Sequence, residues 1–236
     1  MKVYQINIVC GFGSTGRIAV DLAHTIEDEG GCCRIAYGRK EASSEVDSYK
    51  FSNQTEVYTH VLMTRLTDRH GLYSRNATKR LIEDIKNYNP DIIHLHNVHG
   101  YYVNYEMLFD FLKTYNRPIV WTLHDCWAFT GHCAHFDYVG CNKWKKECSQ
   151  CPQKRLYPES LFLDNSTDNY HRKKDAFTLV PNMTLVTVSE WLKDVAGKSF
   201  LKKYPMEKIS NGLDLQVMRP VESNLRKKYN YENKKI

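Results

Sequence analysis

A histidine and an aspartate stand together at the end of an apolar run in the middle of the chain. Residues 119–123 (IVWTL) lie between Pro118 and the polar pair His124 and Asp125, which is typical of a buried strand that ends at the pair. In an open parallel sheet, ligands bind outside the carboxyl ends of the strands. The sequence therefore predicts His124 and Asp125 as catalytic residues. A helix cap by Asp125 beside a packed histidine is the alternative.

Five cysteines follow in a long polar loop: Cys126, Cys133, Cys141, Cys148 and Cys151. Cys148 and Cys151 have the spacing that lets two thiolates point at one metal ion, and Cys133 and Cys141 complete a tetrahedral set. The pattern predicts a structural zinc site formed by these four cysteines. Two disulfides are the alternative arrangement. The alternative ligands are Cys126, His132 and His135.

A glycine-rich turn lies near the N-terminus, between a strand pattern and a helix pattern. Residues 3–9 alternate apolar and polar and lead into CGFGSTG, after which apolar residues recur at helical spacing. Glycines let backbone N–H groups approach a ligand, and a helix N-terminus attracts an anion. The phosphate-binding candidates are therefore Gly11, Gly13, Ser14, Thr15, Gly16 and Arg17. A tight turn without a ligand is the alternative.

The residues after the second expected strand argue against a dinucleotide. Classical NAD binding places an acidic residue there, whereas this sequence has Gly38, Arg39 and Lys40. We therefore expect no redox cofactor.

Histidines mark the end of another short strand, residues 91–95. His94 and His96 point to the same side of a strand, as in some binuclear metal hydrolases, but Val98 replaces the acid that precedes the third histidine, His99, in that signature. Hydrogen bonding at the strand end, with Asn97 facing the crevice, is the preferred interpretation.

The elements that must position these side chains alternate along the chain. Strand patterns occupy residues 3–9, 34–37, 91–95, 119–123, 184–188 and 206–209, and helix patterns occupy 17–29, 56–70, 75–88, 104–115, 168–179 and a stretch from 190 capped by Ser189. This alternation predicts an α/β fold, a parallel sheet with helices on both faces, interrupted by the Cys-rich loop.

Composition limits the partners. The 236 residues are 42% hydrophobic, enough for a core, and the net charge of +6 is too small for a nucleic-acid-binding signature. A phosphate-bearing partner or an anionic membrane surface fits better. The most basic stretch contains Lys193, Lys198, Lys202 and Lys203, which we expect to contact that surface.

We expect a cytoplasmic protein, peripheral on the inner face of the membrane, because no segment resembles a signal peptide or a membrane-spanning helix.

The motifs, taken together, resemble the N-terminal half of family-4 retaining, nucleotide-sugar-dependent glycosyltransferases with the GT-B fold. The similarity is strongest to the colanic-acid and exopolysaccharide branch. The matching segments, between residues 2 and 220, are 11–17, 91–97, 124–131, the Cys-rich loop through Gln153, 187–191 and 209–214.

This resemblance implies a Rossmann-like domain over residues 1–218 and a linker, 219–236, toward a missing C-terminal donor-binding domain. The glycine turn would lie over the donor's phosphates, and His124 would orient the transferred sugar by donating a hydrogen bond. The crevice residues for the acceptor would be His96, Asn97, Ser189 and Asn211. The chain alone would then be inactive.

The leading hypothesis is the acceptor-binding half of a hexosyltransferase-type enzyme for bacterial surface polysaccharide, acting on a lipid-linked or oligosaccharide acceptor. The alternative is a stand-alone, zinc-stabilised α/β module that binds phosphate or sugar phosphates. A metal hydrolase built on the three strand-end histidines ranks third.

Overall fold

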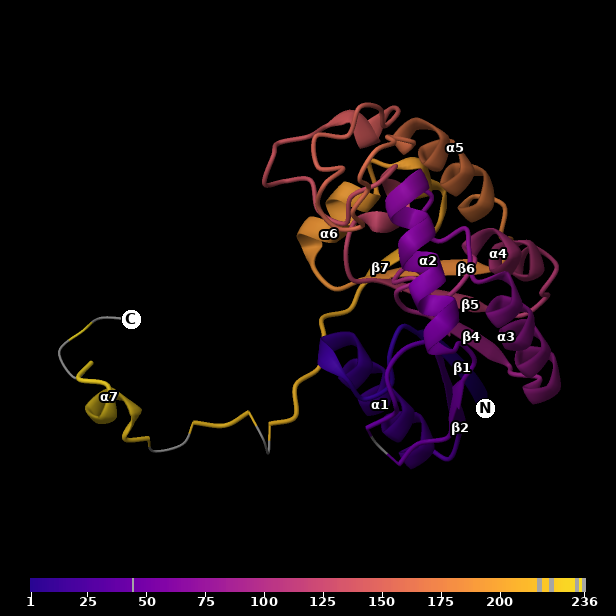
Figure 1. Cartoon of the computed structure of the whole chain (residues 1–236). Coiled ribbons are helices and arrows are strands. Elements are labelled where there is room, and N and C mark those ends of the chain that lie inside the picture. The colour runs from indigo at the N-terminus through magenta and orange to yellow at the C-terminus, as the bar shows by residue number, and fades with distance from the viewer. Residues whose placement is uncertain (44, 216–217, 221–222, 232–233, 235–236) are drawn as a thin grey trace.

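The computed structural model describes residues 1–43, 45–215, 218–220, 223–231 and 234. Its described strands form one parallel sheet in the order β3-β2-β1-β4-β5-β6-β7 (Figure 1). The strands are β1 (Lys2–Asn7), β2 (Cys32–Tyr37), β3 (Ser48–Lys50), β4 (Ile92–Leu95), β5 (Ile119–Leu123), β6 (Met183–Thr187) and β7 (Met206–Lys208). The predicted Rossmann-like α/β fold is confirmed.

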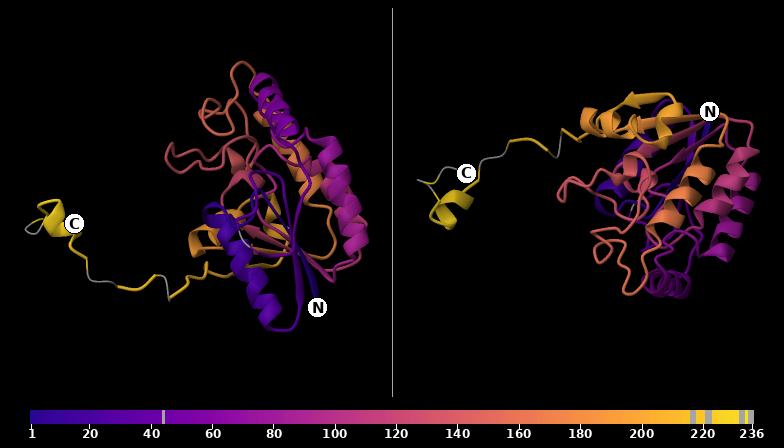
Figure 2. Two further views of the ribbon diagram at one scale, coloured as in Figure 1. Left: turned by 60° about the horizontal axis from the view of Figure 1, so that its bottom comes forward. Right: turned by 90° about the horizontal axis from the view of Figure 1, so that it is seen from above.

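The helices lie unequally on the two faces of the sheet. The α-helices are α1 (Gly13–Asp28), α2 (Gln54–Thr67), α3 (Arg75–Tyr88), α4 (Tyr105–Lys113), α5 (Ser166–Phe177), α6 (Glu190–Ala196) and α7 (Leu225–Lys228), and the 3₁₀ turns are η1 (Trp127–Phe129), η2 (Lys143–Lys145) and η3 (Phe200–Lys203). Figure 2 shows α1 on one side of the sheet and α2, α3 and α5 on the other.

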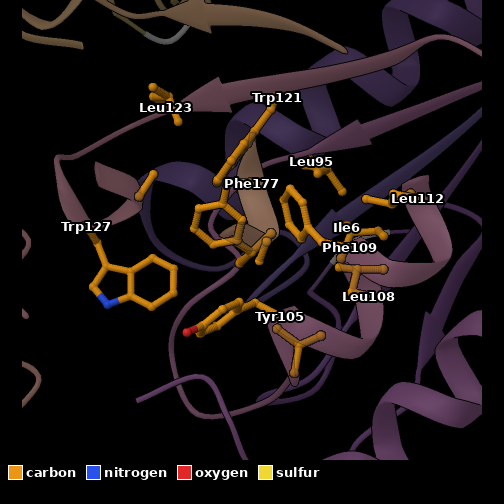
Figure 3. Packing of buried hydrophobic residues seen from close by; sticks show 14 of the residues in the cluster. Ile6, Leu95, Tyr105, Leu108, Phe109, Leu112, Trp121, Leu123, Trp127 and Phe177 are labelled. Carbon is orange, nitrogen blue, oxygen red and sulfur yellow. The ribbon is translucent and has the colours of Figure 1, made fainter. Parts of the chain in front are cut away.

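The main core lies under the helices of the more fully covered face. The rings of Phe109, Trp121 and Phe177 pack with centroids 4.4 to 5.2 Å apart, joining α4, β5 and α5 (Figure 3). Trp121 also donates its indole N–H to the backbone oxygen of His96, at 2.9 Å. This bond ties β5 to the residue that follows β4, so the core fixes the strand ends where the candidate site lies.

On the opposite face, α1 covers only part of the sheet. Val3, Cys33 and Ile35 pack there against Ala19 and Ala23 of α1. Beyond β1, side chains of β4, β5 and β6 form the floor of a cavity of about 510 Å³, walled by α1 and residues 209–214. Helices therefore lie on both faces, as predicted, but the sheet is left open beside α1.

The element boundaries agree with the sequence predictions except in a few places. Helix α1 begins at Gly13 rather than at Arg17, so most of the predicted turn is the first turn of the helix. The edge strand β3 has only three residues and was not predicted. Parts of the predicted linker, 221–222, 232–233 and 235–236, lie outside the described residues, and α7 within the remainder buries no residue. Among the described residues, no helix is both long and apolar enough to cross a membrane.

Candidate functional site

The ends of β4 and β5 bring four of the predicted residues together. His96, Asn97, His124 and Asp125 all line one small cavity of about 10 Å³ at the carboxyl ends of these strands. The two strands are hydrogen-bonded neighbours in the sheet. Residues that follow neighbouring parallel strands meet at the same edge, which is why segments far apart in sequence converge here.

His124 is held by a line of hydrogen bonds that starts in β1. Gln5 Nε2 donates to the Ala19 oxygen at 2.8 Å, which directs its Oε1 toward His96 Nε2, also at 2.8 Å. His96 therefore carries its proton on Nε2, and its Nδ1 accepts from His124 Nε2 at 3.2 Å. Burial lowers the pKa of His96 well below its usual value and also lowers the pKa of His124.

These bonds determine what His124 can offer a ligand. Its Nε2 proton is donated to His96, so Nδ1 is the ring nitrogen that remains without a hydrogen-bond partner among the described residues. Because its lowered pKa keeps the ring neutral near pH 7, this Nδ1 accepts a hydrogen bond rather than donating one. His124 therefore presents a hydrogen-bond acceptor at Nδ1, whereas the sequence analysis expected a donor.

Asp125 has both carboxylate oxygens engaged. Its Oδ2 lies 2.8 Å from His99 Nε2, and its Oδ1 accepts the backbone N–H of Trp127 at 2.8 Å. Burial acts to raise the pKa of this carboxyl, but the attraction of His99 and these hydrogen bonds outweigh it and the pKa is lowered. His99 Nδ1 in turn lies 2.9 Å from the Tyr157 hydroxyl. Asp125 therefore contacts His99 and the backbone of Trp127, whereas the N-cap residue of η1 is Cys126.

The glycine-rich turn forms an exposed helix start. Gly11 and Gly13 have φ values of 70° and 63°, which favour glycine, and the N-cap residue Phe12 is exposed and provides no side-chain cap. A Cβ at Gly16 would lie 3.0 Å from Val9 Cγ2 and 3.2 Å from the Gly11 nitrogen, so a side chain there would be tightly packed. The N–H of Gly11 already donates to the Gly16 oxygen, at 3.1 Å. The first-turn N–H groups from Gly13 onward are thus the anion-binding candidates.

One cation stands beside this turn. Lys40 Nζ lies 3.7 Å from the ring centre of Phe12, the N-cap residue of α1. The first turn of α1 contains no acidic residue that would oppose an anion. The Arg39 guanidinium points elsewhere and donates to the Gly100 oxygen at 3.3 Å.

The other predicted crevice residues are more dispersed. Asn211 lines the 510 Å³ cavity together with His94 and His96. Ser189 accepts the N–H of Leu192 at 3.2 Å and so caps α6, as predicted.

The three strand-end histidines do not converge on one point. His94 bonds to Thr122 Oγ1 at 2.8 Å. His94, His96 and His99 thus have different partners, which disfavours the metal-hydrolase alternative.

The four predicted zinc ligands line a common small cavity. Cys133, Cys141, Cys148 and Cys151 surround it together with His132. A hydrogen bond from Cys133 lowers the pKa of Cys151 to about 7. Backbone N–H groups of Gly131 and Gln153 donate to the sulfurs of Cys148 and Cys151. Among the described residues, however, no three or more histidine, cysteine or acidic side chains are arranged to hold a metal ion.

The alternatives for this cysteine cluster differ in geometry. All eight cysteines of the chain are free thiols, so neither of the two alternative disulfides is formed. Cys126 and His135 do not line the shared cavity. His132 does, with Nδ1 bonded to Asp68 and with Nε2 buried and without a partner in the described part of the chain. Of the three alternative ligands, His132 is therefore the one that lines the cavity of the four cysteines.

Comparison with known proteins decides the family. The sequence model of Glycosyltransferase Family 4 matches residues 15–217. The chain belongs to glycosyltransferase family 4. It is 29% identical over 231 residues to WcaC of Escherichia coli (strain K12), a protein assigned to colanic acid biosynthesis as a glycosyl transferase, covering 91% of this chain and 55% of WcaC.

Solved structures of glycosyltransferases are only weakly similar to this family-4 chain. Medicago truncatula UGT71G1 complexed with UDP-glucose has a TM-score of 0.48 at 8% identity, over 93% of this chain and 53% of that one. The spinosyn forosaminyltransferase SpnP has a TM-score of 0.45 at 13% identity. The match covers 81% of this chain and 47% of SpnP. The chain thus spans about half the length of these relatives. The sheet itself, rather than these likenesses, establishes the fold.

Proposed function

We propose that this chain forms the acceptor-side half of a retaining, nucleotide-sugar-dependent glycosyltransferase for bacterial surface polysaccharide. Family membership and the similarity to WcaC support the reaction class. The observation that carries the proposal is the neutral His124, held by His96 at the carboxyl end of β5. A second, donor-binding domain would supply the remaining contacts to the nucleotide sugar.

In the proposed reaction, the bond between the anomeric carbon and the diphosphate oxygen breaks, and a bond to the acceptor oxygen forms on the same face. The acceptor hydroxyl gives up its proton to the departing diphosphate oxygen. Negative charge grows on the departing diphosphate, and preorganised positive groups lower the barrier. The exposed first turn of α1, with Lys40 beside its N-cap residue Phe12, is suited to attract that charge. His124 Nδ1 would accept a hydroxyl hydrogen of the sugar and fix its orientation.

A structural zinc ion is part of the same proposal. The cavity-lining thiols of Cys133, Cys141, Cys148 and Cys151 would hold it, with His132 as the substitute ligand. Donation of two backbone N–H groups to the sulfurs suits thiolate ligands, because such donors stabilise negative sulfur. Zinc bound there would fasten the Cys-rich loop to the rest of the domain.

We place the protein in the cytoplasm at the inner face of the membrane, where a lipid-linked acceptor would be available. A basic surface supports this location. Lys198 and Lys202 are exposed beside α6, as a contact with anionic lipid requires.

Ligand binding tests the function directly. Isothermal titration with a panel of nucleotide sugars, free nucleotides, sugar phosphates and polysaccharide repeat units should show saccharide binding that His124→Ala weakens. His171→Ala, at an exposed position of α5, is the matched control. Binding of inorganic phosphate and sugar phosphates alone, unaffected by His124→Ala, would instead favour the stand-alone module. No binding of any of these compounds would contradict both functions.

A further inference from the structure

Arg39 is a partly buried cation whose charge is not balanced by a carboxylate. In the described part of the chain it contacts a backbone oxygen and a tyrosine ring, and it forms no ion pair. Every other partly buried arginine among these residues pairs with an acidic side chain; they are Arg34, Arg69, Arg80, Arg117 and Arg172. Taking a charge out of water costs free energy unless an opposite charge offsets it. Arg39 is therefore suited to an anion that the protein does not supply.

The backbone around Arg39 determines where its side chain can reach. Gly38 and Arg39 follow β2, and both donate their N–H groups to the Ile8 oxygen after β1, at 3.2 and 2.9 Å. A Cβ on Gly38 would lie 2.3 Å from the Tyr102 side chain, so glycine permits this close approach. Because β1 lies between β2 and β4, the guanidinium crosses the end of β1 to donate to the Gly100 oxygen. Arg39 thus lies at the carboxyl edge of the sheet, where the candidate site is.

The loop that Arg39 reaches is held from both sides. His70 Nε2 accepts the Gly100 N–H at 3.2 Å. Tyr101 follows with a φ of 68°, which side chains rarely adopt, and such backbone strain is found where the position of a side chain matters for function. The Tyr101 ring centre lies 6.0 Å from Arg39 Cζ and 5.9 Å from the ring centre of Tyr157. We call Arg39, Tyr101 and Tyr157 the Arg39–tyrosine cluster.

No negative charge near the cluster is free to neutralise Arg39. Burial raises the pKa of Tyr101 and of Tyr157, and although the charge of Arg39 acts in the opposite direction, both hydroxyls stay neutral. The carboxylates of the adjoining segments have other partners: Glu41 pairs with Lys50, Glu159 with Arg65 and Asp125 with His99. A guanidinium carries several N–H donors in one plane, which match the oxygens of a carboxylate or a phosphate. In the described chain, Gly100 provides the one acceptor for those of Arg39.

The cluster adjoins the acceptor side of the candidate site. The Tyr157 hydroxyl bonds to His99, and His99 bonds to Asp125, which follows His124. The Arg39 guanidinium is directed toward the loop after β4, whereas the first turn of α1 has Lys40 beside it. An anion at Arg39 would therefore be distinct from the diphosphate that we place at α1.

We propose that the Arg39–tyrosine cluster binds an anionic group, a carboxylate or a phosphate, on the acceptor saccharide. This inference rests on the proposed function, in which the chain binds the acceptor. Arg39 would donate to the oxygens of the anion, and the rings of Tyr101 and Tyr157 would contact the sugar that bears it. A neutral acceptor would leave the partly buried charge unpaired, so the cluster would select for acidic saccharides.

Ligand-observed NMR on the full chain tests this preference with three probes: glucose, glucuronate and glucose 6-phosphate. The two anionic probes should bind about tenfold more tightly than glucose, and added salt should reduce the difference. Arg39→Gln should bring both anionic probes to the level of glucose. Arg39→Lys should keep part of the preference, because lysine retains the charge but not the planar donors. Tighter binding of one anionic probe alone would support the subsite and identify its group.

A matched arginine serves as the control. Arg75→Gln removes the same charge from an exposed position at the start of α3, and it should keep the preference. Equal losses for all three probes in Arg39→Gln would mean that Arg39 only braces the loop after β4, and would overturn the proposal. A loss confined to free nucleoside diphosphates would also overturn it, because Arg39 would then belong to the donor.

The same titrations separate this inference from the proposed function. Equal binding of the three probes to the wild type, weakened by His124→Ala, would contradict the anionic subsite and leave the proposed function standing. Inorganic phosphate that binds through Arg39 without binding of any saccharide would count against the proposed function alone. No binding of any probe would contradict both.

Discussion

His96 Nδ1 lies 3.2 Å from His124 Nε2, so the proton that joins the two rings belongs to His124. This follows because Gln5 accepts from the other nitrogen of His96. Gln5 is fully buried within β1. The hydrogen-bonding state of a residue at the crevice is therefore set by a glutamine in the centre of the sheet.

The first prediction concerns His124 in the enzyme that carries this chain together with a donor-binding domain. His124→Ala should lower the turnover number by roughly 10²-fold, because an oriented polar contact to the sugar is lost. Gln5→Leu should also lower turnover, since His96 would lose the acceptor that fixes its proton. Steady-state kinetics with His171→Ala as control would measure both effects. Full activity of His124→Ala would refute the assignment.

Zinc content gives the second prediction. The purified chain should contain about one zinc ion, and Cys148→Ser should lose it together with part of the thermal stability. Cys32→Ser is the control, because Cys32 is exposed and lies in β2. Elemental analysis and thiol titration would decide. Absence of metal in a freshly prepared protein whose four loop cysteines are oxidised would contradict the prediction.

The third prediction is a loss of stability on mild acidification. Burial lowers the pKa of His60 from 6.5 to about 3. Above pH 6.5 the ring is neutral in both the folded and the unfolded chain. Between pH 6.5 and about 3 only the unfolded chain binds the proton, so the free energy of unfolding should fall by about 1.4 kcal/mol per pH unit from this histidine.

Urea denaturation between pH 7.5 and 4.5 would measure that slope. Buried His96, whose pKa is also far below its usual value, should add to it. His60→Gln should reduce the slope whatever its effect on absolute stability, whereas His24→Gln, at an exposed position, should not. A free energy of unfolding that stays constant from pH 7 to 5 would be inconsistent with a neutral, buried His60.

The fourth prediction concerns the contact between the Cys-rich loop and α5. A Cβ on Gly131 would lie 2.0 Å from the Ser166 oxygen and 2.7 Å from Cys148 Cβ. Gly131→Ala should therefore destabilise the fold by about 2 kcal/mol or more, because the backbone of α5 cannot yield easily. Gly212→Ala is the control, since no atom lies within 4 Å of its added Cβ. Equal unfolding midpoints for the two variants would contradict the packing described here.

Local patterns were sufficient to predict most strands and helices, because buried parallel strands and amphipathic helices have distinct periodicities. Residues 75–88 and 119–123, for example, are helix α3 and strand β5 as expected. The three-residue strand β3 was missed because it is too short to show a period. The convergence of His96, Asn97, His124 and Asp125 was predictable because each follows a strand.

Side-chain partners could not be predicted in the same way. Gln5 is one of the polar residues in the alternating pattern of residues 3–9, whereas in the fold it is the residue that orients His96. Tyr157 lies in a loop without periodicity, so nothing in the sequence indicates its bond to His99. These contacts join residues from distant parts of the chain, and their direction depends on rotamers and tautomers that a sequence pattern does not encode.

The central position of β1 has a consequence for synthesis of the chain on the ribosome. Val3 pairs with Ile92 on one side and with Cys33 on the other. While translation proceeds from Cys33 to Ile92, β1 can be paired on one edge only, and the buried row of Tyr4 and Ile6 lacks the strand that completes it. The nascent protein should therefore be most prone to aggregate, and most dependent on chaperones, before Leu95 has left the exit tunnel.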